Sequence, residues 1–414
     1  MSRVKIQMGE TMGRNKIAAN TRTRKRTRRR FINIYILINV SLFMCLLVGY
    51  KHFSLLRDGY IPLNTVLEKQ SFQKTSARQY EKKIGDLSYS LMLDTDKNIV
   101  TKAGYQFDIG NNIQHFLWMD YLSADKLEEI FNVQISSNGL FVDVQDIEFS
   151  QHEWIEKFPN LIAHAGGTYR EKAYNTFYTN SLEALQQNYS LGHRVFEIDF
   201  YLTSDGKMAA VHDWDQFGNM DGVAMSSQEW KAFQTFGSPV TDSRFTTMLI
   251  GDVLDQMLIN KDMFLVTDTK SFEVSKEEMM TQFTEIYNEA MKRDPELLNR
   301  IVPQVYNEDM FHSIQSIFKF PSVIYTLYAT QSSAEAITQF ANANPEIKVI
   351  TMSTGDPRFG TEFFASLHAV NKKVYTHTIH TYDDLTKYAA LGIDGFYTGL
   401  LLPRDFETLT NLTQ

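Results

Sequence analysis

Two histidines bracket two carboxylates within residues 161–215 of this chain. His164 and His212 lie on either side of Glu197 and Asp199, and all four stand on or just after apolar runs that predict β-strands. Because alternate residues of a strand point to the same side, Glu197 and Asp199 face one region. Positioned histidines transfer protons, and paired carboxylates bind metal ions. The stretch therefore predicts acid/base chemistry beside a metal, with both histidines catalytic.

A later strand adds a third carboxylate. It ends in Asp268 and Lys270, which are again two residues apart and face one way. Three ionised carboxylates repel each other, and a hard divalent cation with oxygen ligands relieves that repulsion. We expect Glu197, Asp199 and Asp268 to bind the metal, and Lys270 to contact an anionic substrate such as a phosphodiester.

Each of these residues alone has an ordinary structural explanation, since a carboxylate or histidine at a strand end often only caps a loop. An apolar barrel strand, however, has little use for a buried Glu-x-Asp pair, because burying unpaired charges costs several kcal/mol. Three further residues stand where they can line the same pocket: Trp214, His377 and Tyr397. We expect these three to bind substrate; packing is the alternative for the two aromatic residues.

Eight short apolar runs alternate with helix-like stretches after residue 160. The predicted strands are 161–165, 195–201, 264–267, 301–305, 323–328, 349–352, 374–378 and 395–397. Such alternation implies parallel strands joined by crossover helices. Residues 161–414 have the typical size of an α/β protein of the (β/α)₈ TIM barrel class, whose active sites lie at the C-terminal ends of the strands. An open doubly wound sheet is the alternative, but no G-x-G-x-x-G motif follows the first strand.

The first fifty residues divide into a basic tail and an apolar segment. Residues 1–30 contain eleven Lys or Arg and one acid, which predicts a disordered cytoplasmic tail, whereas residues 31–50 carry no charge. A helix of that length spans about 30 Å, the thickness of the hydrocarbon core. We expect an uncleaved transmembrane helix in the cell membrane with the catalytic domain extracellular, by the positive-inside rule. A cleaved signal peptide is the alternative.

The net charge of the chain after residue 30 indicates which partners it can bind. The whole chain carries a net charge of −8 and residues 1–30 carry +10, so the rest carries −18. Such an acidic body repels a phosphate backbone, which argues against nucleic acid as a partner.

Residues 51–160 show no motif that identifies chemistry. Residues 60–83 are compatible with a helix, and Ser123 with the eight residues after it predicts a capped helix. Asn138 and Gly139 predict a type I′ turn between two strands of a hairpin. We expect a small α+β unit, either a spacer that sets the catalytic body off the membrane or an accessory module that contacts the envelope, a partner or the barrel mouth.

The motifs HAGG, NSLEAL, FEIDFYLTSDGKMAAVHD and FLVTDTK resemble the signature of the glycerophosphodiester phosphodiesterase family. The resemblance covers the first three predicted strands by motif and residues 161–414 by the rhythm of strands. It implies that His164 and His212 are the family's catalytic pair. It also implies that Glu197, Asp199 and Asp268 hold a divalent metal, Ca²⁺ or Mg²⁺, and that Lys270 fills the family's lysine position.

Three positions depart from the family pattern. Ala165 replaces the arginine of a His-Arg-Gly motif, Thr179 replaces a glutamate, and Asp268 replaces a longer glutamate. The lost arginine removes a bidentate phosphate donor unless another arginine takes its place. The candidates to do so are Arg170, Arg194 and Arg358.

The sequence therefore predicts a membrane-anchored, metal-dependent phosphodiester hydrolase that acts outside the membrane. The expected substrates are glycerophosphodiesters, lipid head groups or envelope polymers with phosphodiester links. Two alternatives stay open. One is a lyase similar to the phosphatidylinositol-specific phospholipases C, which stops at a cyclic phosphate. The other is a non-catalytic barrel that acts as a binding or scaffold protein, which the altered positions suggest.

Overall fold

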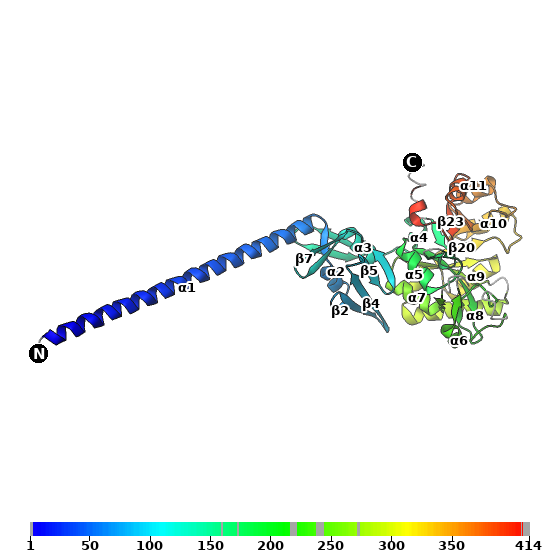
Figure 1. The fold of residues 1–414 in the computed structure, drawn as a ribbon. Helices are drawn as coiled ribbons and strands as arrows, with labels where there is room; N and C mark the ends of the chain where they lie inside the picture. The colour runs from blue at the N-terminus through cyan, green and yellow to red at the C-terminus, as the bar shows by residue number, and fades with distance from the viewer. Residues whose placement is uncertain are drawn as a thin grey trace.

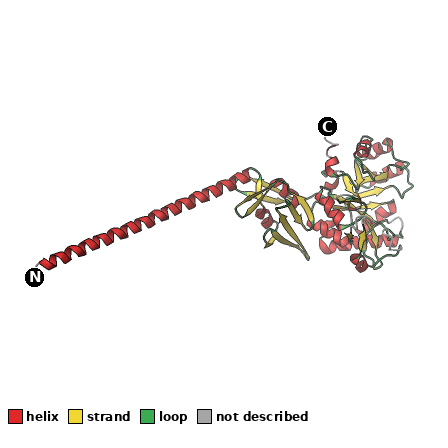
Figure 2. Cartoon of the chain, viewed as in Figure 1, coloured by secondary structure: helices red, strands yellow, loops and turns green. Residues whose placement is uncertain are grey.

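The computed structural model describes residues 3–158, 160–171, 174–215, 222–236, 244–270, 274–406 and 408. The chain has three parts along its length: a long N-terminal helix, a strand-rich accessory region, and a barrel (Figure 1). In the cartoon coloured by secondary structure, strands dominate the accessory region, whereas helices surround the strands of the barrel (Figure 2).

The N-terminal helix α1 spans Arg3–Arg57. Its part from Arg30 to Arg57 is long and apolar enough to cross a membrane, a test that a signal sequence also passes. The predicted apolar segment 31–50 lies within this part. The expectation of a disordered basic tail is wrong for the described residues, because the helix continues through them without a break. Basic residues are good helix formers, so a run of charge does not by itself indicate disorder.

The accessory region, residues 58–158, is a small α+β unit, as predicted. An antiparallel five-stranded sheet contains β2 (Gln73–Ser76), β3 (Gln79–Ile84), β4 (Leu87–Asp94), β5 (Ile99–Lys102) and β6 (Tyr105–Asp108). A three-stranded sheet contains β1 (Tyr60–Pro62), β8 (Met119–Ser123) and β7 (Ile113–Phe116), and β9 (Val133–Ser137) pairs with β10 (Val142–Asp146). Its helices are α2 (Leu63–Lys69), α3 (Ala124–Phe131) and α4 (Glu153–Glu156).

Two local predictions in this region need correction. Residues 60–83 form three strands and a two-turn helix rather than one helix. The hairpin of β9 and β10 exists, but its loop has four residues, from 138 to 141, instead of a two-residue type I′ turn. Gly139 has the expected positive φ of 83°. The Asn138 side chain sets the loop instead, since its Oδ1 accepts hydrogen bonds from the backbone N–H groups of Leu140 and Phe141 at 3.0 and 2.9 Å.

The barrel confirms the predicted fold class. Its eight parallel strands are β11 (Leu161–Ala163), β14 (Val195–Leu202), β18 (Phe264–Asp268), β19 (Ile301–Val305), β20 (Val323–Thr326), β21 (Ile347–Ser353), β22 (Lys373–His377) and β23 (Gly395–Thr398). β11 pairs with both β23 and β14, which closes the barrel, and β15 (Met208–Ala210) adds to β14 in the antiparallel direction. The open-sheet alternative is therefore excluded.

Helices follow the strands and cover the outside of the barrel. They are α5 (Leu182–Ser190), α7 (Ile250–Ile259), α8 (Lys276–Arg293), α9 (Glu308–Ile317), α10 (Ala334–Ala343), α11 (Thr361–Ala369) and α12 (Tyr382–Ala389). Smaller elements are α6 (Ser227–Ala232), η1 (His164–Gly166), η2 (Pro295–Arg300), the pair β12 (Tyr169–Arg170) with β13 (Asn175–Thr176), and the pair β16 (Gln234–Phe236) with β17 (Arg244–Thr246).

One end of the barrel is filled by apolar side chains. Trp154 of α4 is 1% exposed and packs on a cluster formed by residues near the starts of the strands, including Ile162, Phe264 and Val349. Its ring lies edge-on to Tyr375 at 6.4 Å. With the N-terminal end closed in this way, the open cavity of the barrel lies at the opposite, C-terminal end.

The accessory region is docked on the barrel through a buried polar cluster. The carboxylate of Asp262 accepts hydrogen bonds from Asn132 of the accessory region at 2.8 Å and from Tyr189 of α5 at 2.6 Å. Arg194 pairs with the same carboxylate at 2.5 Å. Beside it, the ring of Tyr105 in β6 contacts the ring of Tyr189 at 5.0 Å. The two parts therefore share one interface with a buried ion pair.

We predict that Asp262→Ala destabilises the whole chain by roughly 3–5 kcal/mol, because it leaves the guanidinium of Arg194 buried without its carboxylate. Denaturant unfolding of the full chain in detergent measures the change. The matched control, Asp383→Ala, removes a carboxylate that is exposed on α12. Equal stability of the two variants would contradict the importance of this interface.

Candidate active site

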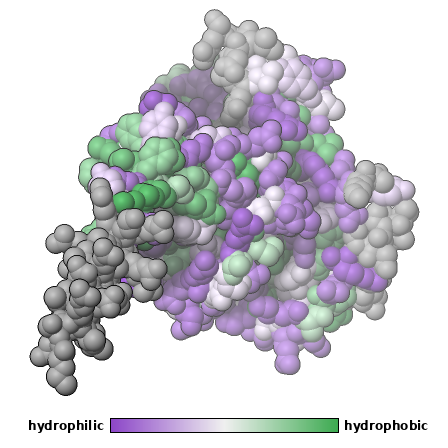
Figure 3. Space-filling model, turned by 60° about the vertical axis from the view of Figure 1, so that its left-hand side comes forward, coloured by the Kyte–Doolittle hydropathy of each residue, from purple (hydrophilic) through white to green (hydrophobic). Residues whose placement is uncertain are grey.

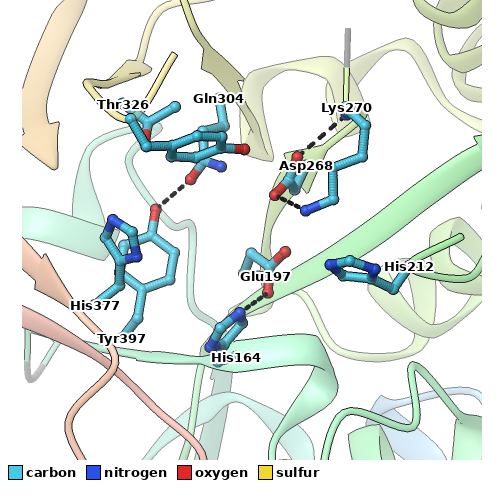
Figure 4. A pocket seen from close by; sticks show the side chains of 10 residues that line it. His164, Glu197, His212, Asp268, Lys270, Gln304, Thr326, His377 and Tyr397 are labelled. Carbon is cyan, nitrogen blue, oxygen red and sulfur yellow. Dashed lines mark hydrogen bonds and ion pairs between the residues drawn. The ribbon is translucent and has the colours of Figure 1, made fainter. Parts of the chain in front are cut away.

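A cavity of about 310 Å³ opens at the C-terminal end of the barrel. Its described lining comes from the ends of seven barrel strands and the segment after β15 (Figure 4). The lining residues are His164, Glu197, His212, Asp268, Lys270, Gln304, Thr326, Tyr328, His377 and Tyr397. Seven of them are residues singled out from the sequence.

The three predicted metal ligands lie together. Oxygen atoms of Glu197, Asp199 and Asp268 fall within 4.8 Å of one another, and all three residues are buried. The register explains this, because β14 and β18 pair in parallel with Asp199 directly opposite Asp268. Oε1 of Glu197 is buried without a hydrogen-bond partner in the described structure. Burial, followed by the charges of Asp199 and Asp268, raises the pKa of Glu197 well above its usual value.

Lys270 lies against this carboxylate cluster. Its Nζ is 2.6 Å from Oδ2 of Asp268 and 3.1 Å from Oδ1 of Asp199. Burial alone would lower the pKa of Lys270, but the two carboxylates outweigh it and raise the pKa above its usual value. The same ammonium keeps the pKa of Asp199 below its usual value against the opposing effect of burial. Tyr306 also donates a hydrogen bond to Asp268. Lys270 thus balances part of the negative charge at the cavity wall.

Asn180 fixes the orientation of Asp199. Its Nδ2 donates to Oδ2 of Asp199 at 3.0 Å, and its Oδ1 accepts from the backbone N–H of Asp199, also at 3.0 Å. Asn180 has a positive φ of 48°, a conformation that asparagine adopts more readily than most residues. The NSLEAL motif therefore supplies both the N-cap Ser181 of α5 and a support for the acidic cluster.

His164 follows β11 in the short helix η1, where a hydrogen bond at Nδ1 holds its ring. Nδ1 lies 2.9 Å from the Thr378 hydroxyl, and Nε2 lies 3.8 Å from Oε2 of Glu197. The next residue, Ala165, has a left-handed backbone and donates its N–H to the same Glu197 oxygen at 2.7 Å. Burial lowers the pKa of His164 to about 4, which favours the neutral form of the ring.

His212 enters the cavity from the segment after β15. Its Nδ1 lies 2.6 Å from Oδ2 of Asp213. A carboxylate at this nitrogen favours the tautomer that carries its proton on Nδ1. In the close-up view, His164 and His212 lie on two sides of Glu197 (Figure 4). The cavity thus contains two oriented imidazoles beside a buried acidic cluster.

Comparison with known protein families identifies the family of this chain. The model of the glycerophosphoryl diester phosphodiesterase family matches residues 166–399, more than half of the chain. The chain belongs to this family. It is accordingly an enzyme of the phosphoric diester hydrolase class. No curated protein sequence matches the chain.

Solved structures of similar fold come from the same family. A protein assigned as a glycerophosphoryl diester phosphodiesterase from Silicibacter pomeroyi is 16% identical and has a TM-score of 0.50; the match covers 64% of this chain and 99% of that one. A glycerophosphodiester phosphodiesterase from Parabacteroides distasonis is 15% identical, with a TM-score of 0.49 and coverage of 62% and 100%. At 16% identity, the similarity to the Silicibacter pomeroyi protein shows only that the two chains share the barrel fold.

The predicted substrate contacts of this phosphodiesterase divide into two groups. His377 and Tyr397 line the cavity, and the Tyr397 hydroxyl donates to Gln304 at 2.8 Å. Trp214 does not belong to the described lining, which corrects the expectation from the sequence. It is 5% exposed, its Nε1 donates to the carbonyl of Leu202 at 3.0 Å, and its ring packs on Trp230. Its role is packing beneath the segment that carries His212.

None of the three candidate arginines replaces the arginine that the family carries at position 165. Arg170 binds the carbonyl of Leu400 at 2.8 Å, Arg194 pairs with Asp262, and Arg358 pairs with Asp356 at 2.7 Å. All three lie outside the described cavity lining, in which Lys270 is the one Lys or Arg. The altered position 165 still contributes to the site, because its backbone N–H holds Glu197.

Several site residues escaped the sequence analysis. Gln304 and Thr326 were detectable, since each is a polar residue within an apolar strand that points into the cavity. Asp213 was detectable as the neighbour of His212. Thr378 carried no signal, because a threonine at a strand end is ordinary.

We predict that Asn180→Ala lowers kcat/KM for phosphodiester hydrolysis by about 10–100-fold, because Asp199 loses the amide that orients it. Steady-state kinetics of the full chain measures the effect. The control is Asn175→Ala, which removes an exposed asparagine from β13. Unchanged kinetics of Asn180→Ala would show that Asp199 needs no such support.

Proposed function

We propose that this chain is a membrane-anchored, metal-dependent phosphodiesterase that hydrolyses glycerophosphodiesters or envelope phosphodiesters on the outer side of the membrane. The observation that carries the proposal is the grouping of His164 and His212 around a buried three-carboxylate cluster in one cavity. The chemistry of this cavity suits an anionic substrate only if a cation balances the acidic residues.

The acidic cluster fits a hard divalent cation. All candidate ligands are carboxylate oxygens, and Oε1 of Glu197 is buried without a hydrogen bond, as expected of a ligand atom. Ca²⁺ and Mg²⁺ prefer such oxygen ligands, and Glu197, Asp199 and Asp268 are the residues that would hold the ion. When bound, the ion supplies charge that polarises a phosphoryl oxygen. Lys270 adds a second positive charge at the same wall of the cavity.

The two histidines have complementary positions for proton transfer. One takes the proton from the attacking hydroxyl or water, and the other gives a proton to the leaving alkoxide. Thr378 orients His164 and Asp213 orients His212, so neither ring needs to reorganise during the reaction. His377 and Tyr397 are proposed to contact the alcohol part of the substrate across the cavity.

The location on the outer side rests on α1. Its apolar part follows a basic segment, and the positive-inside rule places that segment in the cytoplasm. The accessory region lies between α1 and the barrel (Figure 1), so in this proposal it stands between the membrane and the barrel.

We predict that His164→Ala and His212→Ala each lower hydrolysis of a glycerophosphodiester by about 10²–10⁴-fold. Purified full chain with Ca²⁺ or Mg²⁺ is assayed by release of glycerol phosphate. His312→Ala, which removes an exposed histidine from α9, is the control and should retain activity. A stable cyclic phosphate as the final product would favour the lyase alternative, and equal activity of all variants would refute the proposed roles.

We also predict that Ca²⁺ or Mg²⁺ raises the thermal midpoint of the wild type, because an ion that binds only the folded state stabilises it. Asp268→Asn should lose most of that increase, whereas Asp383→Asn on the exposed face of α12 should keep it. Differential scanning fluorimetry with EDTA as reference measures both. Identical increases in the two variants would place any bound ion elsewhere.

A further inference from the structure

Two hairpin tips of the accessory region expose large apolar side chains. At the tip of β7 and β8, Leu117 is 55% exposed and Trp118 is 82% exposed. At the loop of β9 and β10, Leu140 is 69% exposed and Phe141 is 75% exposed. We call these four residues the apolar tips. Four such side chains on two loops of one small unit are unusual for a surface that meets only water.

The backbone at one tip adds to this observation. Leu117 has a positive φ of 56° in a two-residue connection, where glycine or asparagine is normally found. A leucine in this conformation costs on the order of 1 kcal/mol or more. The chain thus presents an apolar side chain at a position where a small polar residue would fit with less strain.

The direction of the first tip relative to α1 can be derived from two contacts of strand β8, which leads away from that tip. The carbonyl of Gly59, just after α1, accepts from the N–H of Ala124 at 2.9 Å. Further back in α1, His52 lies 2.7 Å from the Tyr121 hydroxyl, Nδ1 to oxygen. From Ala124 back to the tip at Trp118, β8 therefore runs in the direction that leads from Gly59 toward the N-terminus of α1.

The same two contacts give the position of the tip along the axis of α1. From Ala124 to Tyr121 a strand rises about 10 Å, and from Gly59 to His52 a helix rises about the same. Trp118 lies another three strand residues onward, which corresponds to about seven more helix residues. That places Trp118 level with Cys45, within the apolar part of α1. Figure 1 shows β7 reaching back beneath the end of α1.

The second tip meets α1 near the end of its apolar part. A Cβ on Gly139 would lie 2.8 Å from the ring of Phe53, so this loop touches the helix three residues after Tyr50. The apolar part of α1 exposes most of its large side chains, from Phe31 to Tyr50, and Figure 3 shows hydrophobic surface gathered on one side of the molecule. The second tip therefore lies against α1 just beyond the apolar segment 31–50.

We propose that the apolar tips insert into the outer lipid surface beside α1 and hold the accessory region against the bilayer. The proposal rests on the proposed membrane-spanning role of α1, because the lipid is then already present at the level of the tips. Tryptophan favours the membrane interface, and leucine and phenylalanine gain free energy from leaving water. The protein would then be attached to the membrane at two places, α1 and the apolar tips. Two attachments restrict rotation of the barrel relative to the membrane.

Tryptophan fluorescence tests the insertion with the full chain. The other three tryptophans, Trp154, Trp214 and Trp230, are at most 5% exposed, so Trp118 is the one within reach of lipid. In phosphatidylcholine and phosphatidylglycerol vesicles, brominated lipid should quench the wild type, and Trp118→Phe should lose that quenching. Leu117→Ser with Phe141→Ser should reduce the quenching of Trp118. Met291→Ser, an exposed apolar residue of α8, is the matched control and should not.

The helix is monitored separately through Cys45, the chain's only cysteine. Protection of Cys45 from a water-soluble maleimide shows that α1 is inserted. Protected Cys45 with no lipid quenching of Trp118 would overturn the tip proposal and leave the anchor standing. Reactive Cys45 would refute both. A blue shift of Trp118 that grows with protein concentration, without lipid quenching, would assign the tips to contact with a second copy and also overturn the proposal.

Discussion

The repulsion among three buried carboxylates is the constraint on which the site depends. Parallel pairing of β14 and β18 forces Asp199 opposite Asp268, and the alternation of β14 puts Glu197 on the same side. Such a cluster is unstable without positive charge and fixed hydrogen bonds. The chain provides both: Lys270 contacts two of the carboxylates, Asn180 and Tyr306 donate to them, and the N–H of Ala165 holds the third.

This constraint explains why the altered family position is tolerated. Ala165 lacks the arginine side chain of the family motif, yet its left-handed backbone keeps the N–H aimed at Glu197. The contribution of this position to the acidic cluster comes from the main chain. In the proposed function, recognition of a phosphate would therefore depend on Lys270 and on any bound cation, because no arginine lines the described cavity.

Residues of the barrel were easier to predict than those of the accessory region, for a physical reason. Barrel strands are buried on both faces and read as continuous apolar runs, so all eight were located to within a few residues. Strand β2 is exposed throughout, so its residues QKTS carry no alternating pattern. The site residues followed from polar groups within apolar strands. Trp214 was misplaced because its packing on Trp230 depends on a contact that sequence spacing does not encode.

The closed end of the barrel also limits how substrate enters the cavity and how product leaves it. Trp154 and its neighbours fill the interior beneath the cavity, so among the described residues the cavity opens toward the C-terminal end of the barrel. In the proposed function, both products would leave through the opening by which the next substrate enters. A single opening of this kind would make turnover sensitive to product concentration. Product that stays near the opening would slow the entry of the next substrate.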